Sequence, residues 1–493
     1  MIYGFSPFGY EGTLIQVEVD LRRGIPATDI VGLADGAVRE SRERMMAAIR
    51  NSGYDYPSER VLISLSPEDL KKEGAGFDVP VALAVLSAQA GIDESVMAIG
   101  ELELSGKVRL VNGIHAALTA ARAAEVYKVV IPAGYNGEIP AGVNVCRVKN
   151  LKEAFEAVRT GKGFGSVGMV YDRPPFGLDD SEMYAFDGIE GLDFLKYALA
   201  VAAAGGHHLL AFGHPGCGKS RLIQLMPHLL PALEIEERSQ VERIYDLAGY
   251  VPKAGIGWNR PFRVPHQTAT IEGMCGGGPR LAPGEVTLAH NGVLFLDEAA
   301  EFKSSVLQML RVPLEGGAIT LSRAGRSTVY PARFQFVMAT HPCPCGNLGS
   351  KDKMCLCSSS SVEQYWRKFS GPLLNRVPIR VDCNDDMVCE DVSLDALRGK
   401  IALAYKRQMD RQGKRNQFLA PDELADVRER MTDGARRVLA SHETADTPRA
   451  VSNLMKVAAT VADMVKGGQT EIFESDIKTA EKLCGRLPTV CVE

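Results

Sequence analysis

The stretch "GHPGCGKS", Gly213 to Ser220, decides the fold of the middle of this 493-residue chain. It fits the pattern G-x-x-x-x-G-K-S, in which glycines let the backbone curl until its N–H groups face phosphate oxygens. The apolar "HHLLAF" before it predicts a buried strand and "RLIQLMPHLL" after it predicts a helix, which is the context that the pattern requires. A chance glycine-rich turn is the alternative, and about 0.03–0.05 such matches are expected in a chain of this length.

Different residues of this loop are expected to contact different parts of a nucleotide and its metal ion. Lys219 would neutralise the β- and γ-phosphates, and the Ser220 hydroxyl would bind Mg²⁺. The full set of expected nucleotide contacts is Gly213, Gly216, Cys217, Gly218, Lys219, Ser220 and Ile189.

A second acidic motif, "GVLFLDEAAEF" from Gly292 to Phe302, strengthens this prediction. Its apolar residues predict a buried strand that ends in Asp297 and Glu298. Asp297 would complete the Mg²⁺ shell and Glu298 would polarise the attacking water, although a core strand with an acidic end is a common alternative. Asp297 follows Lys219 by 78 residues, so we expect an insertion beside the second core helix.

Composition restricts the remaining possibilities. No run of eighteen apolar residues is present, so no membrane span is expected, and the N-terminus lacks the basic and apolar regions of a secretory signal. We therefore expect a cytoplasmic protein with reduced thiols. The net charge is -5, so any contact with nucleic acid has to come from a local basic surface.

The order of patterns along the chain predicts an α/β fold in three parts. Residues 1–163 alternate strand-like and helix-like segments, and 164–186 read as a linker because Gly, Ser, Pro and acidic residues cluster there. A second α/β block, 187–392, carries the phosphate loop, and 393–493 is almost wholly helical.

Several motifs together resemble one family. "GHPGCGKS", "RPFRVPHQTA", "LAHNGVLFLDEAAEF", "YPARFQFVMATHPCPCG" and "SGPLLNR" resemble the YifB/ComM family of Mg-chelatase-like AAA+ ATPases, as do "DIVGLADGAVRESRERMMAAIRNSGY" and "KKEGAGFDVPVALAVL" nearer the N-terminus. The resemblance implies a Lon-like α/β N-terminal domain, a P-loop AAA+ core with a parallel sheet and an α-helical C-terminal lid. It implies a homo-oligomeric, hexameric ring with ATP and Mg²⁺ bound between subunits. It also implies single-stranded or branched DNA as substrate, with helicase or branch-migration activity in recombination or natural transformation.

Two rival functions stay open at this point. One is a metal-chelatase-type motor subunit that remodels a protein partner and ignores DNA. The other is a nucleotide-gated scaffold that binds ATP and hydrolyses it weakly.

The resemblance assigns roles to three further residues. Arg376 in "SGPLLNR" is similar to the arginine finger that reaches a neighbour's γ-phosphate, and Arg449 in "DTPRAVSNLMKV" is similar to the sensor-2 arginine of the lid. Each would otherwise read as a surface salt bridge. His341 stands where the family usually has the sensor-1 Asn, and an imidazole there can orient water or contact a phosphate with a reach and protonation that differ from those of an amide.

The N-terminal part resembles the proteolytic domain of Lon in "GAGFDVPVALAVLSAQA" and "GELELSGKVRLVNGIHAALTAA". That enzyme uses a Ser nucleophile activated by Lys. The "GAGFD" turn has no hydroxyl where the Ser would fall, and His115 stands where the Lys would fall. We therefore expect no proteolysis, and a role in assembly or partner binding.

Four of the eleven cysteines, Cys343, Cys345, Cys355 and Cys357, fall in the loop 341–357 as two C-x-C pairs. Four thiolates suit tetrahedral Zn²⁺, although C-x-C is tighter than the usual C-x-x-C spacing. Free thiols kept for packing are the alternative. Thiol catalysis is a third option, but no strong base partner is visible in the sequence.

Two basic segments are candidates for contact with DNA. "GGAITLSRAGRSTVYPARF", Gly316 to Phe334, predicts a hairpin with Arg323 and Arg326 at its tip, where they would either hold phosphates in a ring pore or mark a solvated turn. The segment Arg398 to Gln417 contains seven Lys and Arg residues and one Asp. This pattern indicates either a surface that binds the DNA backbone or a solvated helix.

Overall fold

The fold comes from a computed structural model that describes residues 1–32, 36–67, 72, 75–166, 172–178, 183–250, 256–279, 281–323, 326–350, 353–384, 389–445, 447–465 and 471–488. Parts of the expected linker and of the helical C-terminal part lie outside these residues. So do the hairpin turn at 324–325 and positions 351–352 of the cysteine loop.

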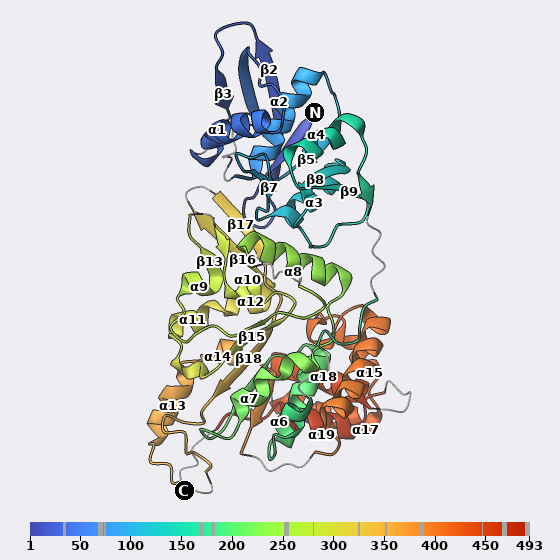
Figure 1. The fold of residues 1–493 in the computed structure, drawn as a ribbon. Coiled ribbons are helices and arrows are strands. Elements are labelled where there is room, and N and C mark those ends of the chain that lie inside the picture. The colour runs from blue at the N-terminus through green and yellow to red at the C-terminus, as the bar shows by residue number, and fades with distance from the viewer. Residues whose placement is uncertain are drawn as a thin grey trace.

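The N-terminal part is a mixed sheet covered by helices (Figure 1). Its eight strands run in the order β10-β9-β8-β5-β1-β2-β4-β3 across the described residues. Their bounds are β1 Ile2–Ser6, β2 Thr13–Arg22, β3 Thr28–Val31, β4 Arg60–Ser66, β5 Val96–Ala98, β8 Lys128–Pro132, β9 Asn144–Val148 and β10 Gly165–Ser166. A separate pair is β6 Glu101–Leu102 with β7 Val108–Arg109, and the helices are α1 Gly36–Asn51, η1 Ala75–Phe77, α2 Asp78–Ala90, α3 Ile114–Ala123 and α4 Leu151–Thr160.

Helix α2 lies inside this part because its sequence is almost wholly apolar, and every side chain from Asp78 to Ser87 is buried. The buried carboxylate of Asp78 is paired with Arg44, whose Nε lies 3.0 Å from Asp78 Oδ2. Asp78 also accepts hydrogen bonds from the Ser41 hydroxyl and the Leu102 N–H, as a buried charge requires.

The central part is a parallel five-stranded sheet in the order β12-β15-β18-β11-β19. These strands are β11 Leu209–Phe212, β12 Phe262–Arg263, β15 Val293–Leu296, β18 Gln335–Thr340 and β19 Ile379–Asp382. Every residue of β11, β15 and β18 is buried, as the apolar runs of a parallel sheet covered on both faces require. Helices α5 Met183–Asp187, α6 Asp193–Gly205, α7 Lys219–Gln224 and η2 Met226–Leu229 accompany β11.

The interval between the phosphate loop and β15 holds α8 Ile235–Ala248, α9 Ile271–Cys275, β13 Gly276–Gly277, β14 Ala282–Pro283 and α10 Glu285–Leu288. After β15 come η3 Ala299–Glu301, α11 Ser304–Met309, α12 Arg311–Gly316 and the hairpin of β16 Ala318–Arg323 with β17 Arg326–Pro331. Helices α13 Ser359–Arg367 and α14 Gly371–Leu374 precede β19.

The C-terminal part is helical, as the sequence predicts. It comprises α15 Leu394–Gln412, η4 Asn416–Phe418, α16 Leu424–Glu429, α17 Asp433–Ala445, α18 Pro448–Met464 and α19 Glu474–Leu483. These helices share one hydrophobic core with α6 and the strands β11 and β19. The basic run on α15 is neither a free face nor wholly solvated, because Arg398 is buried against the carbonyl of His228 and Arg411 pairs with the buried Asp463.

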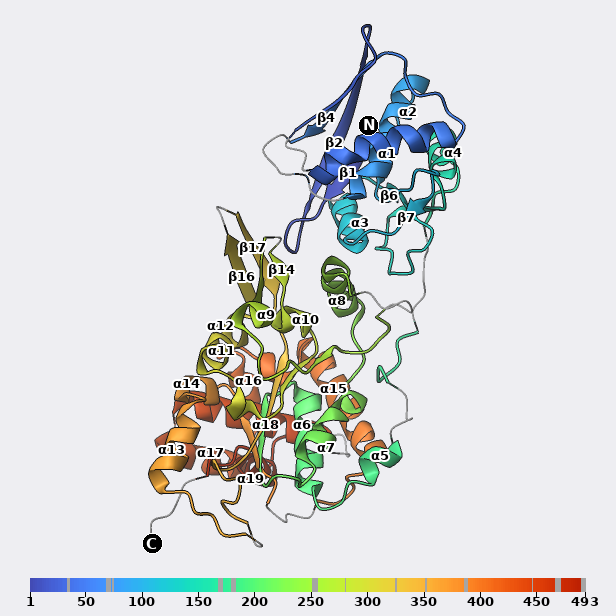
Figure 2. The same ribbon diagram turned by 60° about the vertical axis from the view of Figure 1, so that its left-hand side comes forward.

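The N-terminal part contacts helix α8 and the β16–β17 hairpin, and the hairpin extends towards it in Figures 1 and 2. Helix α3 packs on α8, where the His115 N–H donates to Asp246 at 2.7 Å and the Glu138 N–H donates to Glu242 at 2.7 Å. The described chain is therefore an α/β protein with a parallel sheet and a helical C-terminal part, and this confirms the predicted fold class. None of the helices within the described residues is long and apolar enough to cross a membrane.

Candidate nucleotide site

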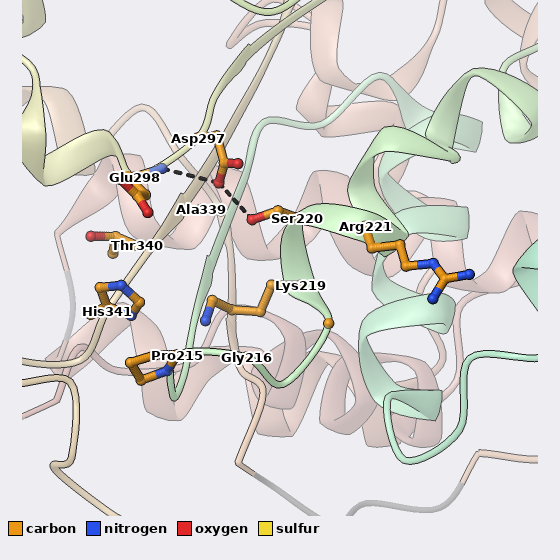
Figure 3. Close-up of a pocket in the computed structure, with 11 residues that line it drawn as sticks. Pro215, Gly216, Lys219, Ser220, Arg221, Asp297, Glu298, Ala339, Thr340 and His341 are labelled. Atoms are coloured by element: carbon orange, nitrogen blue, oxygen red, sulfur yellow. Dashed lines mark hydrogen bonds between the residues drawn. The ribbon is translucent and has the colours of Figure 1, made fainter. Parts of the chain in front are cut away.

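The site forms where three neighbouring parallel strands end. The phosphate loop follows β11, Asp297 and Glu298 follow β15, and His341 follows β18, which lies between the other two. The carboxyl ends of parallel strands meet at one edge of a sheet, and ligands bind there in such folds. A cavity of about 310 Å³ lies at this edge, lined by residues of all three segments (Figure 3).

The phosphate loop takes a shape that its glycines permit. Gly216 and Gly218 have φ of +81° and +96°, which side-chain-bearing residues rarely adopt, and α7 begins directly afterwards at Lys219. The buried Lys219 Nζ donates to the carbonyl oxygens of Gly213 at 2.8 Å and His214 at 2.7 Å. Both acceptors are uncharged carbonyl groups, so they do not take the place of an anion beside the Lys219 side chain in the cavity.

The remaining predicted contacts of the loop lie around it. Cys217 Sγ is 3.6 Å from Lys219 Nζ. Ile189 is partly buried, and its Cγ2 would lie 4.0 Å from a Cβ at Gly218, so it borders the loop from outside the cavity lining.

The predicted Mg²⁺ ligands meet across the site. The Ser220 hydroxyl donates to Asp297 Oδ1 at 2.6 Å, and the same oxygen accepts from the Glu298 N–H at 3.1 Å (Figure 3). A hydroxyl and a carboxylate at this separation offer two hard oxygen ligands, which Mg²⁺ prefers. Glu298 has φ of +48°, an uncommon backbone conformation that costs about 1 kcal/mol or more and is often found at functional sites.

Sequence reasoning missed a partner of Glu298. Gln267 Nε2 donates to Glu298 Oε2 at 2.6 Å from the loop that precedes α9. Gln267 belongs to "RPFRVPHQTA", a motif of the family resemblance in which no residue had been given a role. The pairing depends on a contact across 31 positions of the chain, so no local pattern could have indicated it.

The strand between the two motifs adds His341 and the buried Thr340 to the cavity. His341 Nδ1 lies 3.4 Å from the carbonyl oxygen of Gly213, so the imidazole rests beside the phosphate loop. Arg221 also lines the cavity, although the sequence analysis did not single it out.

The two arginines carried over from the family lie together, and neither lines this cavity. Arg376 follows α14, and Arg449 stands in the first turn of α18, where the Thr447 side chain caps the helix. Both guanidinium groups donate to Glu315 of α12, Arg376 to Oε2 and Arg449 to Oε1 at 3.2 Å.

The four cysteines of the loop 341–357 converge. The Sγ atoms of Cys343 and Cys345 are 3.5 Å apart, and each lies 3.7 Å from Cys355 Sγ. Cys357 completes the group, whose sulfurs all lie within 4.8 Å of one another. Four bonds of about 2.3 Å to one tetrahedral ion place sulfurs about 4 Å apart, so the geometry fits a single Zn²⁺.

The cysteine loop also packs on the phosphate loop. His214 Nδ1 lies within hydrogen-bonding distance, 3.2 Å, of the Gly346 carbonyl oxygen. A Cβ at Gly346 would come within 2.8 Å of the Pro215 ring. The cluster therefore supports the segment that would hold the phosphates.

The hairpin forms as predicted, and one of its two arginines, Arg326, lies near the N-terminal part. Arg323 and Arg326 are exposed and directly opposite each other in the ladder. The guanidinium carbon of Arg326 lies 5.5 Å from the centroid of the Phe8 ring, and the Tyr10 N–H donates to Thr328 Oγ1 at 3.2 Å.

His115 lies inside the joint between the N-terminal part and α8. Its Nε2 is 2.9 Å from Ser239 Oγ, and burial lowers the pKa of the imidazole to about 4. The position that would hold a catalytic Lys in Lon thus holds a neutral ring in an interface.

These features define a P-loop nucleotide-binding protein whose acidic strand and sensor strand have the AAA+ arrangement. The family model described as "Magnesium chelatase, subunit ChlI" matches residues 185–389, and "Subunit ChlI of Mg-chelatase" matches 17–135.

Three relatives extend the comparison. Uncharacterized protein YifB of Escherichia coli is 33% identical over 98% of this chain and 95% of its own length, and competence protein ComM of Haemophilus influenzae is 30% identical over 97% and 96%. Lon protease of Aquifex aeolicus is 28% identical over 26% of this chain and 17% of its own length. The chain belongs to the YifB/ComM family of Mg-chelatase-like AAA+ ATPases, as its motifs predicted.

Proposed function

We propose that this protein is an ATP-driven ring motor that acts on DNA, with each nucleotide held between two subunits. The observation that carries the proposal is the position of Arg376 and Arg449, which lie together outside the cavity that holds Lys219. Arg221 lines the same cavity, but its side chain points away from Lys219 and Asp297 (Figure 3), so an arginine that faces the γ-phosphate would have to come from another subunit. This requirement is met by a ring in which the arginines of each subunit contact the nucleotide bound by the next subunit. We propose that the ring is a hexamer.

The cavity fits Mg²⁺–ATP by the chemistry of its residues. The loop N–H groups and Lys219 would hold the phosphates, while Ser220 and Asp297 would hold the metal ion, which neutralises developing charge on the phosphoryl oxygens. Glu298 would orient and polarise water, and Gln267 would hold its carboxylate until the site closes. His341 lies beside the loop, where its ring would contact a phosphate or the water.

DNA is proposed as the substrate on two grounds. One relative is named a competence protein, and the hairpin of this chain presents exposed Arg323 and Arg326. Guanidinium groups on a pore hairpin would grip phosphates without reading sequence, as a translocating helicase or branch-migration motor requires.

The rival function is a motor subunit of metal-chelatase type, which would drive a protein partner. The match to the magnesium chelatase model over residues 185–389 favours it. A scaffold that binds ATP and hydrolyses little is the third function, and His341 in place of Asn is its only support.

We also propose that the cysteine loop holds Zn²⁺ and that residues 1–163 form a Lon-like domain without protease activity. The sulfur separations of 3.5–3.7 Å support the first proposal. The burial of His115 against Ser239 supports the second, because a side chain enclosed in the joint with α8 is not open to a peptide substrate. The core and lid would then span 187–392 and 393–493, with 164–186 as linker.

An ATPase assay with and without single-stranded DNA separates the three functions. A DNA motor should hydrolyse ATP faster with DNA, and Arg323→Ala with Arg326→Ala should remove the stimulation while leaving basal hydrolysis intact. The control is Arg367→Ala, which removes an exposed arginine of α13 that pairs with Glu363. Turnover that ignores DNA favours the chelatase-type function, and negligible turnover favours the scaffold.

A further inference from the structure

The Glu315 carboxylate binds both Arg376 and Arg449, the two arginines that would act on the nucleotide of a neighbouring subunit. Its Oε2 accepts from Arg376 Nη2, and its Oε1 accepts from Arg449 Nη2 at 3.2 Å. Arg376 belongs to the segment after α14 and Arg449 to α18, so their separation depends on how two distant parts of the chain pack. One carboxylate therefore sets the distance between two guanidinium groups.

The charges explain why such a residue is needed. Two guanidinium groups held side by side repel each other, and a carboxylate between them removes that repulsion. The hydrogen bond from Arg376 lowers the pKa of the Glu315 carboxyl below its usual value, so the group stays ionised at neutral pH.

Stability alone does not account for this cluster. The Glu315 side chain is 60% exposed and that of Arg449 is 49% exposed, whereas the Arg376 side chain is 10% exposed. Exposed ion pairs contribute little to folding. A separate hydrogen bond, from Asn453 Nδ2 to the Asn375 carbonyl oxygen at 3.1 Å, already attaches α18 to the segment that carries Arg376.

We propose that Glu315 is a positioning residue that holds Arg376 and Arg449 as a pair for the γ-phosphate of the nucleotide bound by the neighbouring subunit. The inference rests on the proposed function of a site shared between subunits. A γ-phosphate carries several anionic oxygens, so two guanidinium groups at a set spacing can each bind one. Loss of that spacing should slow the reaction without weakening ATP binding, because the phosphate loop that binds ATP belongs to the other subunit.

The first test compares Glu315→Ala and Glu315→Gln in the full-length protein. Either variant should lower kcat about tenfold or more, since small displacements of catalytic groups are costly. The KM for ATP and the thermal unfolding midpoint should stay at wild-type values. Gln keeps the volume of the side chain but loses the charge, so it guards against misfolding of the Ala variant. Glu363→Ala is the control, because it removes an exposed Arg–Glu pair on α13 and should leave kcat unchanged.

The second test mixes subunits. Glu315→Ala subunits should recover activity with Lys219→Ala subunits, because mixed interfaces then combine an intact phosphate loop with an intact arginine pair. They should recover nothing with Arg376→Ala subunits, since both variants damage the same side of the interface. The double variant Glu315→Ala with Arg376→Ala should be no slower than Arg376→Ala alone.

The outcomes separate this inference from the function on which it rests. If Arg376→Ala hydrolyses ATP normally, the shared site itself is wrong. If Arg376→Ala is slow but both Glu315 variants match the wild type, only the role of Glu315 is overturned. Recovery in the mixture of Glu315→Ala with Arg376→Ala, or additive losses in the double variant, would likewise overturn it.

Discussion

The Ser220 hydroxyl donates a hydrogen bond to the Asp297 carboxylate over 2.6 Å, although 77 positions separate the two residues in the chain. The contact joins the first turn of α7 to the end of β15. It places the two expected metal ligands at one point before any metal binds, so little reorganisation is needed on binding.

Substitutions on the two sides of this contact should separate ATP binding from hydrolysis. Lys219→Ala removes the cation that faces the β- and γ-phosphates and should abolish binding of a fluorescent ATP analogue. Glu298→Gln keeps the shape of the side chain but loses the charge that polarises water, so ATP should bind and remain uncleaved. Hydrolysis by Glu298→Gln at the wild-type rate would show that the acidic residue was assigned wrongly.

The hydrogen bond from Gln267 to Glu298 should affect turnover in a specific way. Gln267→Ala frees the carboxylate from its 2.6 Å partner, so kcat should change several-fold while the affinity for ATP stays constant. Gln364→Ala, which removes an exposed amide on α13 outside the cavity lining, is the matched control. Equal turnover of the wild type and Gln267→Ala would leave Gln267 without a role in the reaction.

The arginine finger can be tested by complementation. Arg376→Ala should lose hydrolysis but keep ATP affinity, and mixing it with Lys219→Ala subunits should restore part of the activity. The reason is that some interfaces then pair an intact phosphate loop with an intact finger. If subunits exchange between rings and no ratio restores activity, Arg376 does not act on a neighbour.

The cysteine cluster should carry about one zinc per chain in protein purified without chelators. Cys355→Ser with Cys357→Ser should release the metal and slow hydrolysis, because the loop contacts His214 and packs on Pro215. Cys146→Ser, in a strand of the N-terminal sheet, is the control and should keep the metal. Metal analysis that finds neither zinc nor iron would leave four reduced thiols in a packing role.

The joint between the N-terminal part and α8 should depend on pH through Glu242. Burial raises the pKa of Glu242 to about 7, next to Glu138 and to Asp246, whose pKa burial raises to about 6. Because the pKa of Glu242 is raised in the folded protein, its protonated carboxyl group stabilises the fold fully below pH about 4.5. This stabilisation is lost as the pH rises through 7.

Glu242→Gln should therefore raise the free energy of unfolding by about 1–3 kcal/mol at pH 8 and change it little at pH 5. Thermal unfolding at both pH values measures the difference, and Glu236→Gln, exposed on the same helix, is the control. The buried His115, whose pKa is lowered to about 4, gives the opposite pH dependence. Its neutral imidazole stabilises the fold above pH about 6.5, and this stabilisation is lost as the pH falls below that value. A pH-independent effect of Glu242→Gln would contradict this account.

The sequence by itself determined the features whose geometry is local. The phosphate loop, the acidic strand end and the helix start at Thr447 are each set by adjacent residues whose backbone preferences and hydrogen bonds act within a few positions. The apolar runs before Gly213 and Asp297 also determined buried strands in the middle of the chain, and the pattern after residue 393 determined that the C-terminal part is helical. The spacing of Cys343, Cys345, Cys355 and Cys357 indicated the cluster, because a short loop brings its own ends together.

Only the tertiary structure decided the contacts between segments far apart in the chain. It placed Gln267 on Glu298, Arg376 and Arg449 on Glu315, and the β16–β17 hairpin beside Phe8 and Tyr10. It also buried His115 against Ser239 and, on α15, placed Arg398 against the His228 carbonyl and Arg411 against Asp463. Such pairs depend on how whole sheets and helices pack, and packing depends on the shape and burial of many residues at once, so no single stretch of sequence encodes them.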